Sequence, residues 1–242
     1  MDPVPAAPSA YAFVEGMRNT RRTLEVWRRR PWHVLGGWLA GSLVAAVGLL
    51  FVVWLVAVVS RAGGFTGTTQ AQVIRPPFVV GDLRDVATIL GHNLLVLALH
   101  AMACVAGFIA GSSVPEQARR HQGIRRVIHD QCGRLAIAFV IGATIFSLSA
   151  QGLLIGTEAA SVATRLQTSP GLLLVALLPH ALLELTALFL PLAAWIIASR
   201  RGEWDQLLAA TFVTVGISLP ALVLAALIEV YVSPHWLAAL LS

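Results

Sequence analysis

Five long runs of apolar residues take up most of this 242-residue sequence. A run of about 18 or more apolar residues is long enough to cross the hydrocarbon core of a membrane as a helix. Hydrophobic residues make up 57% of the chain and charged residues 12%, which is too little charge for the surface of a soluble domain. We therefore predict an all-α, polytopic membrane helix bundle with five spans, near residues 33–60, 86–114, 134–157, 171–199 and 207–232.

The arginines predict which side of the membrane each loop faces. All 17 basic residues are arginines, and thirteen of them lie before the first span, between spans two and three, or between spans four and five. Positive charge close to the ends of spans favours the cytoplasmic side, so we predict the N-terminus inside and the C-terminus outside. The same distribution explains why the chain is basic: the arginines set the topology and attract anionic lipid. Nucleic acid is therefore not expected as a partner.

The sequence divides into residues 1–32 and a transmembrane part, residues 33–242. The first ten residues are rich in proline and alanine and predict a loose cytoplasmic tail. From Tyr11 to Trp32, apolar residues recur at roughly helical spacing among six arginines. This segment is either an amphipathic helix on the inner leaflet or a charged lead-in to the first span.

The loop between spans two and three, residues 115–134, predicts a basic surface helix that could dock a cytoplasmic partner. His121, His129 and Cys132 in the same loop do not have the spacing of a closed zinc site, so we predict neither a metal nor a cofactor. The docking residues are expected to be Arg119, Arg120, Arg125 and Arg126.

Polar side chains inside the predicted spans are the candidate functional residues, because ionisable groups are costly to place against lipid. His180 and Glu184 are four residues apart and share one helix face. Pro179 leaves two alternatives for the fourth run: one helix over residues 171–199, or a broken helix in which residues 171–178 dip into the membrane and residues 180–199 cross it. In the second alternative, the polar residues of four spans all lie in the outer half of the membrane. They either line one pocket that binds a partner or lipid, or form separate ties between helices. They are His92, Asn93, Gln151, His180, Glu184 and Glu229.

Three segments, in order, resemble the membrane domain of the stage II sporulation protein M (SpoIIM) family. They are "SAQGLLIG" (149–156), "LLPHALLELTALFLPLAAW" (177–195) and "ALIEVYVSP" (226–234). Gln151 and Ala181 stand where the family usually has asparagine and glycine. The residues that match its pattern are Gly152, His180, Glu184, Glu229 and Pro234.

The resemblance implies a multi-pass protein of the bacterial plasma membrane. The family's namesake acts with peptidoglycan-cleaving partners, its relatives often accompany a cytoplasmic ATPase, and no catalytic activity is assigned to the family. The first hypothesis is therefore a non-catalytic membrane subunit of a cell-envelope complex, whose outer polar cluster binds a partner or lipid.

Two further hypotheses stay open. One is a permease-like transport subunit coupled to a cytoplasmic ATPase, which would require an N-terminal surface helix, a basic cytoplasmic helix after span two and a broken helix near the outer face. The other is an intramembrane hydrolase that uses a metal or an activated water, although the sequence holds no HExxH motif, phosphate-binding glycine loop or serine-nucleophile elbow. Self-association is also left open. The hydrolase would use His92, His180, Glu184 and Glu229.

Overall fold

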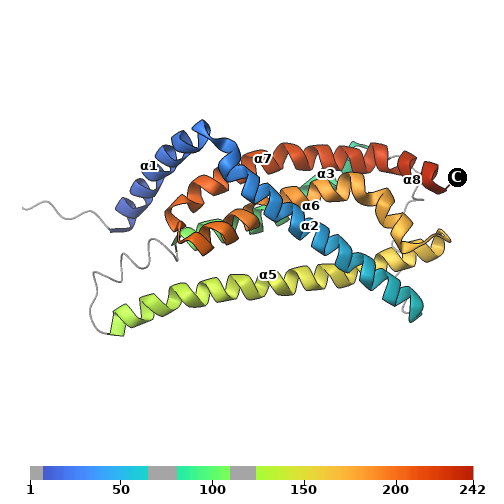
Figure 1. Cartoon of the computed structure of the whole chain (residues 1–242), viewed down its shortest axis with the longest axis horizontal. Helices are drawn as coiled ribbons and strands as arrows, with labels where there is room; N and C mark the ends of the chain where they lie inside the picture. Colours follow the sequence, from blue (N-terminus) through green and yellow to red (C-terminus); the bar gives the residue numbers. More distant parts are fainter. Residues whose placement is uncertain (1–7, 65–80, 110–123, 242) are drawn as a thin grey trace, which may run out of the picture. The chain divides into compact units, whose positions relative to one another are not determined.

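The chain forms a bundle of long apolar helices, shown in Figure 1. The computed structural model describes residues 8–64, 81–109 and 124–241, and within these ranges it contains no strand. The all-α, multi-pass fold predicted from the sequence is confirmed by five segments that are long and apolar enough to cross a membrane. These are Pro31–Ala62, Leu83–Phe108, Thr144–Arg165, Pro170–Arg201 and Trp204–Leu241.

Before the first span comes α1 (Pro8–Arg29), and the last span combines a 3₁₀ turn, an α-helix, a π-helical turn and a final α-helix. The other elements are α2 (Pro31–Ala62), α3 (Leu83–Phe108), α5 (Ile124–Arg165), α6 (Pro170–Arg201), η2 (Trp204–Gln206), α7 (Leu207–Leu227), η3 (Ile228–Val232) and α8 (Ser233–Leu241).

The starts of α3 and α6 are set by side-chain capping. Asp82 and Asp85 form a reciprocal capping box: Asp82 Oδ1 accepts a hydrogen bond from the Asp85 N–H at 3.1 Å, and Asp85 Oδ2 accepts one from the Asp82 N–H at 2.9 Å. At α6, the Ser169 hydroxyl accepts a hydrogen bond from the Leu172 N–H at 3.1 Å. Pro170 follows at the first helical position, where its missing N–H has no consequence.

Of the two alternatives at Pro179, the structure has the continuous helix, and the broken one is wrong. Helix α6 runs without interruption from Pro170 to Arg201, so residues 171–178 are its first two turns and do not form a separate dipping segment. A proline removes one backbone hydrogen bond, which a membrane helix tolerates when packing holds it on both sides. Leu173 and Ala176 before Pro179, and Phe189 after it, are buried in the same core and provide that packing.

Three other predicted boundaries also move. Helix α5 continues to Arg165 instead of ending near residue 157, because Ala159, Ala160 and Ala163 extend its apolar face and are buried in the core. At its other end α5 starts at Ile124, inside the loop predicted to be a separate basic helix. The last span continues past residue 232 through α8 to Leu241.

The segment from Tyr11 to Trp32 was predicted to include a helix, and α1 confirms this. Trp27, near the end of α1, packs edge-to-face on Trp38 of α2, with ring centroids 5.2 Å apart. An ion pair of 3.6 Å joins Arg21 to Glu25 one turn later on the exposed surface of the helix. Whether α1 lies on the inner leaflet stays a prediction.

The chain divides into two compact units, each assembled from parts of several helices. Unit 1 comprises Met1–Gly41, Leu97–Ile141 and Leu190–Gly216, and unit 2 comprises Ser42–Val96, Gly142–Phe189 and Ile217–Ser242. In unit 1, α3 approaches α6 so closely that a Cβ atom on Gly107 would lie 2.5 Å from Nε1 of Trp195. The buried core there contains Cys104, Phe108, Leu192, Trp195, Ala198 and Leu207.

Unit 2 depends on a close contact between α2 and α5. A Cβ atom on Gly156 would lie 2.6 Å from Cβ of Val56 and 3.0 Å from the carbonyl oxygen of Val53, and one on Gly152 would lie 2.9 Å from Cγ1 of Val52. Two glycines four residues apart allow this approach, as small residues commonly do between membrane helices. The glycines of the segment "QGLLIG", residues 151–156, therefore have a packing role in this fold.

The remaining faces of these helices are apolar and exposed. Val44 and Phe51 of α2, Leu95 of α3, and Phe146 and Leu154 of α5 all belong to unit 2 and are more than half exposed. Side chains of this size rarely gather on the surface of a soluble protein without a partner that covers them. In a multi-pass membrane protein, the acyl chains of the lipid cover them.

We predict that Gly156→Ala destabilises the protein by about 1–3 kcal/mol, because the added methyl group has no space against the α2 backbone. Thermal unfolding in detergent would show a lower melting temperature. Gly48→Ala is the matched control, because nothing lies within 4 Å of a Cβ atom at that position. Equal melting temperatures for the two variants would contradict the packing role.

We predict that alkaline phosphatase fused after Ser242 is active, because that enzyme folds only outside the cytoplasm and the arginines place the C-terminus there. The same reporter fused after Gly202, in the connection between α6 and η2, should be inactive. Activity measured in intact cells tests both. The reverse pattern would show that the predicted orientation is inverted.

Candidate functional site

Unit 2 contains a cavity of about 500 Å³, which is within the size range of small-molecule binding sites. Helices α2, α5 and α6 provide most of its apolar wall, including Leu49, Val53, Ile155 and Leu177. Five of the six polar residues predicted to cluster line this one cavity. They are His92, Asn93, His180, Glu184 and Glu229.

Three elements bring these side chains to the cavity. His92 and Asn93 are neighbours on α3, while His180 and Glu184 lie one turn apart on the same face of α6. Glu229 lies in η3, where the backbone widens from an α-helix to a π-helix for five residues. Such π-helical turns inside longer helices occur frequently at functional sites, because they redirect the side chains that they carry.

His180 is held by a hydrogen bond to Ser233. Its Nδ1 atom lies 2.8 Å from the Ser233 hydroxyl, and both side chains are buried. Among the described residues, no hydrogen bond or ion pair joins His180 to Glu184, although the sequence places the two on one helix face. The partner of His180 is therefore on α8, and the bond ties α6 to α8 within unit 2.

The same pair has the distance expected of a nucleophilic serine and its base. Such a pair also needs a third group that orients the imidazole. Within the described part of the chain, the other ring nitrogen of His180 has no hydrogen-bond partner. The geometry therefore favours an interhelical tie over a catalytic pair.

The carboxyl groups of Glu184 and Glu229 are close enough to each other to interact electrostatically. His92 and Asn93 lie near Glu184 on its α3 side. Asn93 is 4% exposed, and its side chain lies close enough to the Glu184 carboxyl group to interact with it, although its amide nitrogen Nδ2 makes no hydrogen bond of good geometry among the described residues. The amide therefore faces the carboxyl group across the cavity lining, where a ligand could bridge the two.

A second cavity of about 320 Å³ adjoins the first and shares His180 and Glu229 with it. Glu158, Ser233 and Leu237 contribute to its lining. Ser233 and Glu158 are not among the candidate site residues predicted from the sequence. The serine–proline pair at 233–234 is a helix-start signal that could have pointed to Ser233, whereas nothing in the sequence distinguishes Glu158.

The sixth predicted residue, Gln151, does not reach the cavity. Its side-chain nitrogen Nε2 lies 3.3 Å from the hydroxyl of Ser147, one turn earlier on α5, so it bonds within its own helix. The predicted depth does not determine which way the side chain points. Gln151 therefore follows neither predicted alternative, since it neither lines the pocket nor joins two helices.

Two of the four arginines predicted to dock a partner lie in the part of the chain that the structure describes. Arg119 and Arg120 lie outside the described residues. Arg125 and Arg126 belong to the first turn of α5, which makes their backbone helical as predicted. Their role in docking a cytoplasmic partner stays a prediction.

The cavity can bind polar groups but does not have the geometry of a metal site. Within the described residues, no three His, Cys, Asp or Glu side chains are arranged to hold a metal ion. The carboxyl oxygens can accept hydrogen bonds, the Asn93 amide can donate one, and the apolar wall can pack against hydrocarbon. The lining therefore suits a ligand with a polar end and an apolar body.

Residues 131–234 match the family model described as SpoIIM, stage II sporulation protein M, which confirms the resemblance seen in the sequence. The matched segment includes His180, Glu184, Glu229 and Ser233, while His92 and Asn93 precede it. No curated protein and no solved structure matches the chain.

We predict that Ser233→Ala lowers the free energy of unfolding by about 1 kcal/mol, because a buried imidazole nitrogen loses its partner. The readout is thermal unfolding in detergent. Ser147→Ala serves as the control, since Ser147 is exposed and its bond to Gln151 lies within α5, so its removal breaks no contact between helices. A Ser233→Ala protein as stable as the Ser147→Ala protein would contradict the interhelical tie.

Proposed function

We propose, from the match of residues 131–234 to stage II sporulation protein M, that this chain is a non-catalytic subunit of a cell-envelope complex in the bacterial plasma membrane. The complex is of the peptidoglycan-remodelling type. The five spans make the chain a multi-pass membrane protein, and the unit 2 cavity is the site that binds a lipid or a segment of a partner.

The observation that carries this proposal is the convergence of three elements on one cavity. Five polar side chains, separated along the sequence by up to 137 positions from His92 to Glu229, line a space whose other walls are apolar. Ionisable groups inside membrane spans commonly mark a functional site, because their burial is unfavourable without one. The Asn93 amide and the Glu184 carboxyl group lie close together without a hydrogen bond of good geometry, which leaves both able to contact a ligand.

A binding role also agrees with the chemistry of the site. His180 is engaged by Ser233, and the described residues provide no third group to orient it. The transport hypothesis relied in part on a broken helix near Pro179, and the continuous α6 removes that support. A subunit that binds and positions other components needs neither a nucleophile nor a broken helix.

We predict that a peptidoglycan-cleaving enzyme co-purifies with the affinity-tagged full chain after gentle extraction from its native host. The double variant Glu184→Gln with Glu229→Gln should reduce the amount of this enzyme recovered by about tenfold. Loss of two carboxylates from a buried binding site removes charge-assisted hydrogen bonds, which are the strong ones. Quantitative mass spectrometry of the eluate provides the measurement.

Gln151→Leu is the matched control, because Gln151 lies in a span of the same unit but outside the cavity. It should retain the partner. A wild-type chain that purifies alone would overturn the proposed complex. A partner that is recovered equally with the double variant would leave the complex in place but exclude the cavity as its binding site.

A further inference from the structure

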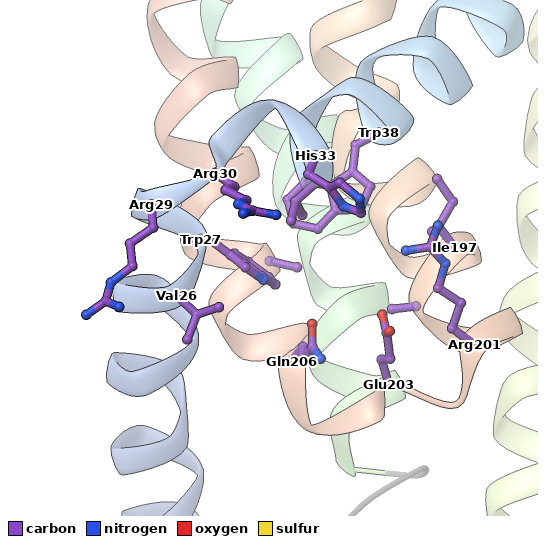
Figure 2. Close-up of a pocket in the computed structure, with 13 residues that line it drawn as sticks. Val26, Trp27, Arg29, Arg30, His33, Trp38, Ile197, Arg201, Glu203 and Gln206 are labelled. Carbon is purple, nitrogen blue, oxygen red and sulfur yellow. The ribbon is translucent and has the colours of Figure 1, made fainter.

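A second kind of site lies in unit 1, where helix ends that carry arginines surround a cavity of about 460 Å³. The end of α1, the start of α2, the end of α6 and the segment from Glu203 into α7 form its walls, as Figure 2 shows. It shares no residue with the unit 2 cavity.

All four of these helix ends belong to the same side of the membrane. The chain crosses five times, so the start of α2, the end of α6 and the start of α7 lie on the side of the N-terminus. The positions of the arginines predict that this side is cytoplasmic. The cavity is therefore at the level of the lipid headgroups, where phosphate is the commonest anion.

The cationic side chains of the cavity come from the junction of α1 with α2 and from the end of α6. Figure 2 shows Arg30 and Arg201 extending toward the cavity from opposite sides, whereas the guanidinium of Arg29 points away. Within the described residues, neither Arg30 nor Arg201 has a carboxylate within ion-pair distance. Two guanidinium groups on opposite sides can each offer paired N–H donors to the oxygens of one phosphate.

The rest of the lining suits a phosphate attached to an organic body. Trp27 and Trp38, which contact each other edge-to-face, form an aromatic wall, and Val34 and Ile197 add aliphatic surface. Glu203 is the one acidic residue in the lining, so the arginines leave the cavity with net positive charge. Tryptophan at this depth is typical of the membrane interface, where its ring packs against the upper part of the lipid.

We propose that the unit 1 cavity binds a phosphate ester, with Arg30 and Arg201 on the phosphate oxygens and the Trp27–Trp38 wall against the attached organic group. An anionic phospholipid from the cytoplasmic leaflet and a soluble phosphate compound share this chemistry. The proposal does not depend on the function assigned to unit 2.

The test uses the purified full chain in a phosphate-free detergent and native mass spectrometry to count bound ligand. The probe is a short-chain phosphatidylglycerol, compared with the diacylglycerol of the same chain length, which lacks the phosphate. We predict one bound phosphatidylglycerol and affinity about tenfold lower for the diacylglycerol, because only the former can form charge-assisted hydrogen bonds. Equal binding of the two lipids to the wild-type chain would overturn the proposal.

Variants then locate the site. Arg30→Gln with Arg201→Gln should lower the affinity for phosphatidylglycerol by about tenfold, while Arg22→Gln with Arg28→Gln should change it by less than about twofold, since surface charge alone contributes little in detergent. The control pair removes the same charge from α1 residues that do not line the cavity. Equal losses in the two double variants would overturn the assignment.

The double variant Arg30→Lys with Arg201→Lys keeps both charges. It replaces the glutamine double variant as the test if that protein does not fold. It should bind about threefold to tenfold more weakly than wild type, because lysine cannot form the paired contact of a guanidinium. Unchanged affinity in this variant would exclude the arginine contacts. Competition separates the two sources: displacement of the lipid by glycerol phosphate or inorganic phosphate at similar concentration would identify a soluble compound, and displacement by phospholipid alone would identify a membrane lipid.

Discussion

The hydrocarbon core of the membrane contains no water to satisfy polar groups, and the fold of this chain follows from that constraint. Every span is helical, so the backbone forms its own hydrogen bonds. Hydroxyl side chains inside the spans do the same: Thr186 donates to the Leu182 carbonyl at 2.6 Å, and Ser218 donates to the Ala187 carbonyl of another helix at 2.6 Å. The larger polar side chains His92, Asn93, His180, Glu184 and Glu229 instead gather where helices meet.

Close packing and the unit 2 cavity are two results of the same arrangement. Glycines at 152 and 156 let α5 approach the α2 backbone, and the alanines that follow keep α5 in the core through another two turns. The larger side chains of α3, α6 and η3 cannot pack as closely at the cavity, and the space that they leave is where His92, Glu184 and Glu229 lie. A ligand that enters this space would meet the polar groups without any need to separate the close α2–α5 contact.

The two cavities select ligands of opposite character. The lining of the unit 2 cavity has two carboxyl groups, two imidazoles and an amide, so it favours a ligand that donates hydrogen bonds or carries positive charge. The unit 1 cavity has arginines beside two tryptophans and favours an anion. A membrane subunit that positions other components could use one site for a partner and the other for a lipid, because their preferences do not compete.

The sequence by itself determined the helical class, the number of spans and the set of polar residues, because length and apolarity decide whether a segment can cross a membrane. It also selected His92, Asn93, Glu184 and Glu229 as candidates for one site, although the shallow depth that it gave Glu184 required a helix break at Pro179 that the structure does not have. The tertiary structure decided the direction of each side chain around its helix axis. Gln151 was selected with them but bonds within α5, and His180 binds Ser233, 53 positions away, instead of Glu184 four positions away. The continuity of α6 through Pro179 was also decided by packing, because buried residues on both sides compensate for one missing backbone hydrogen bond.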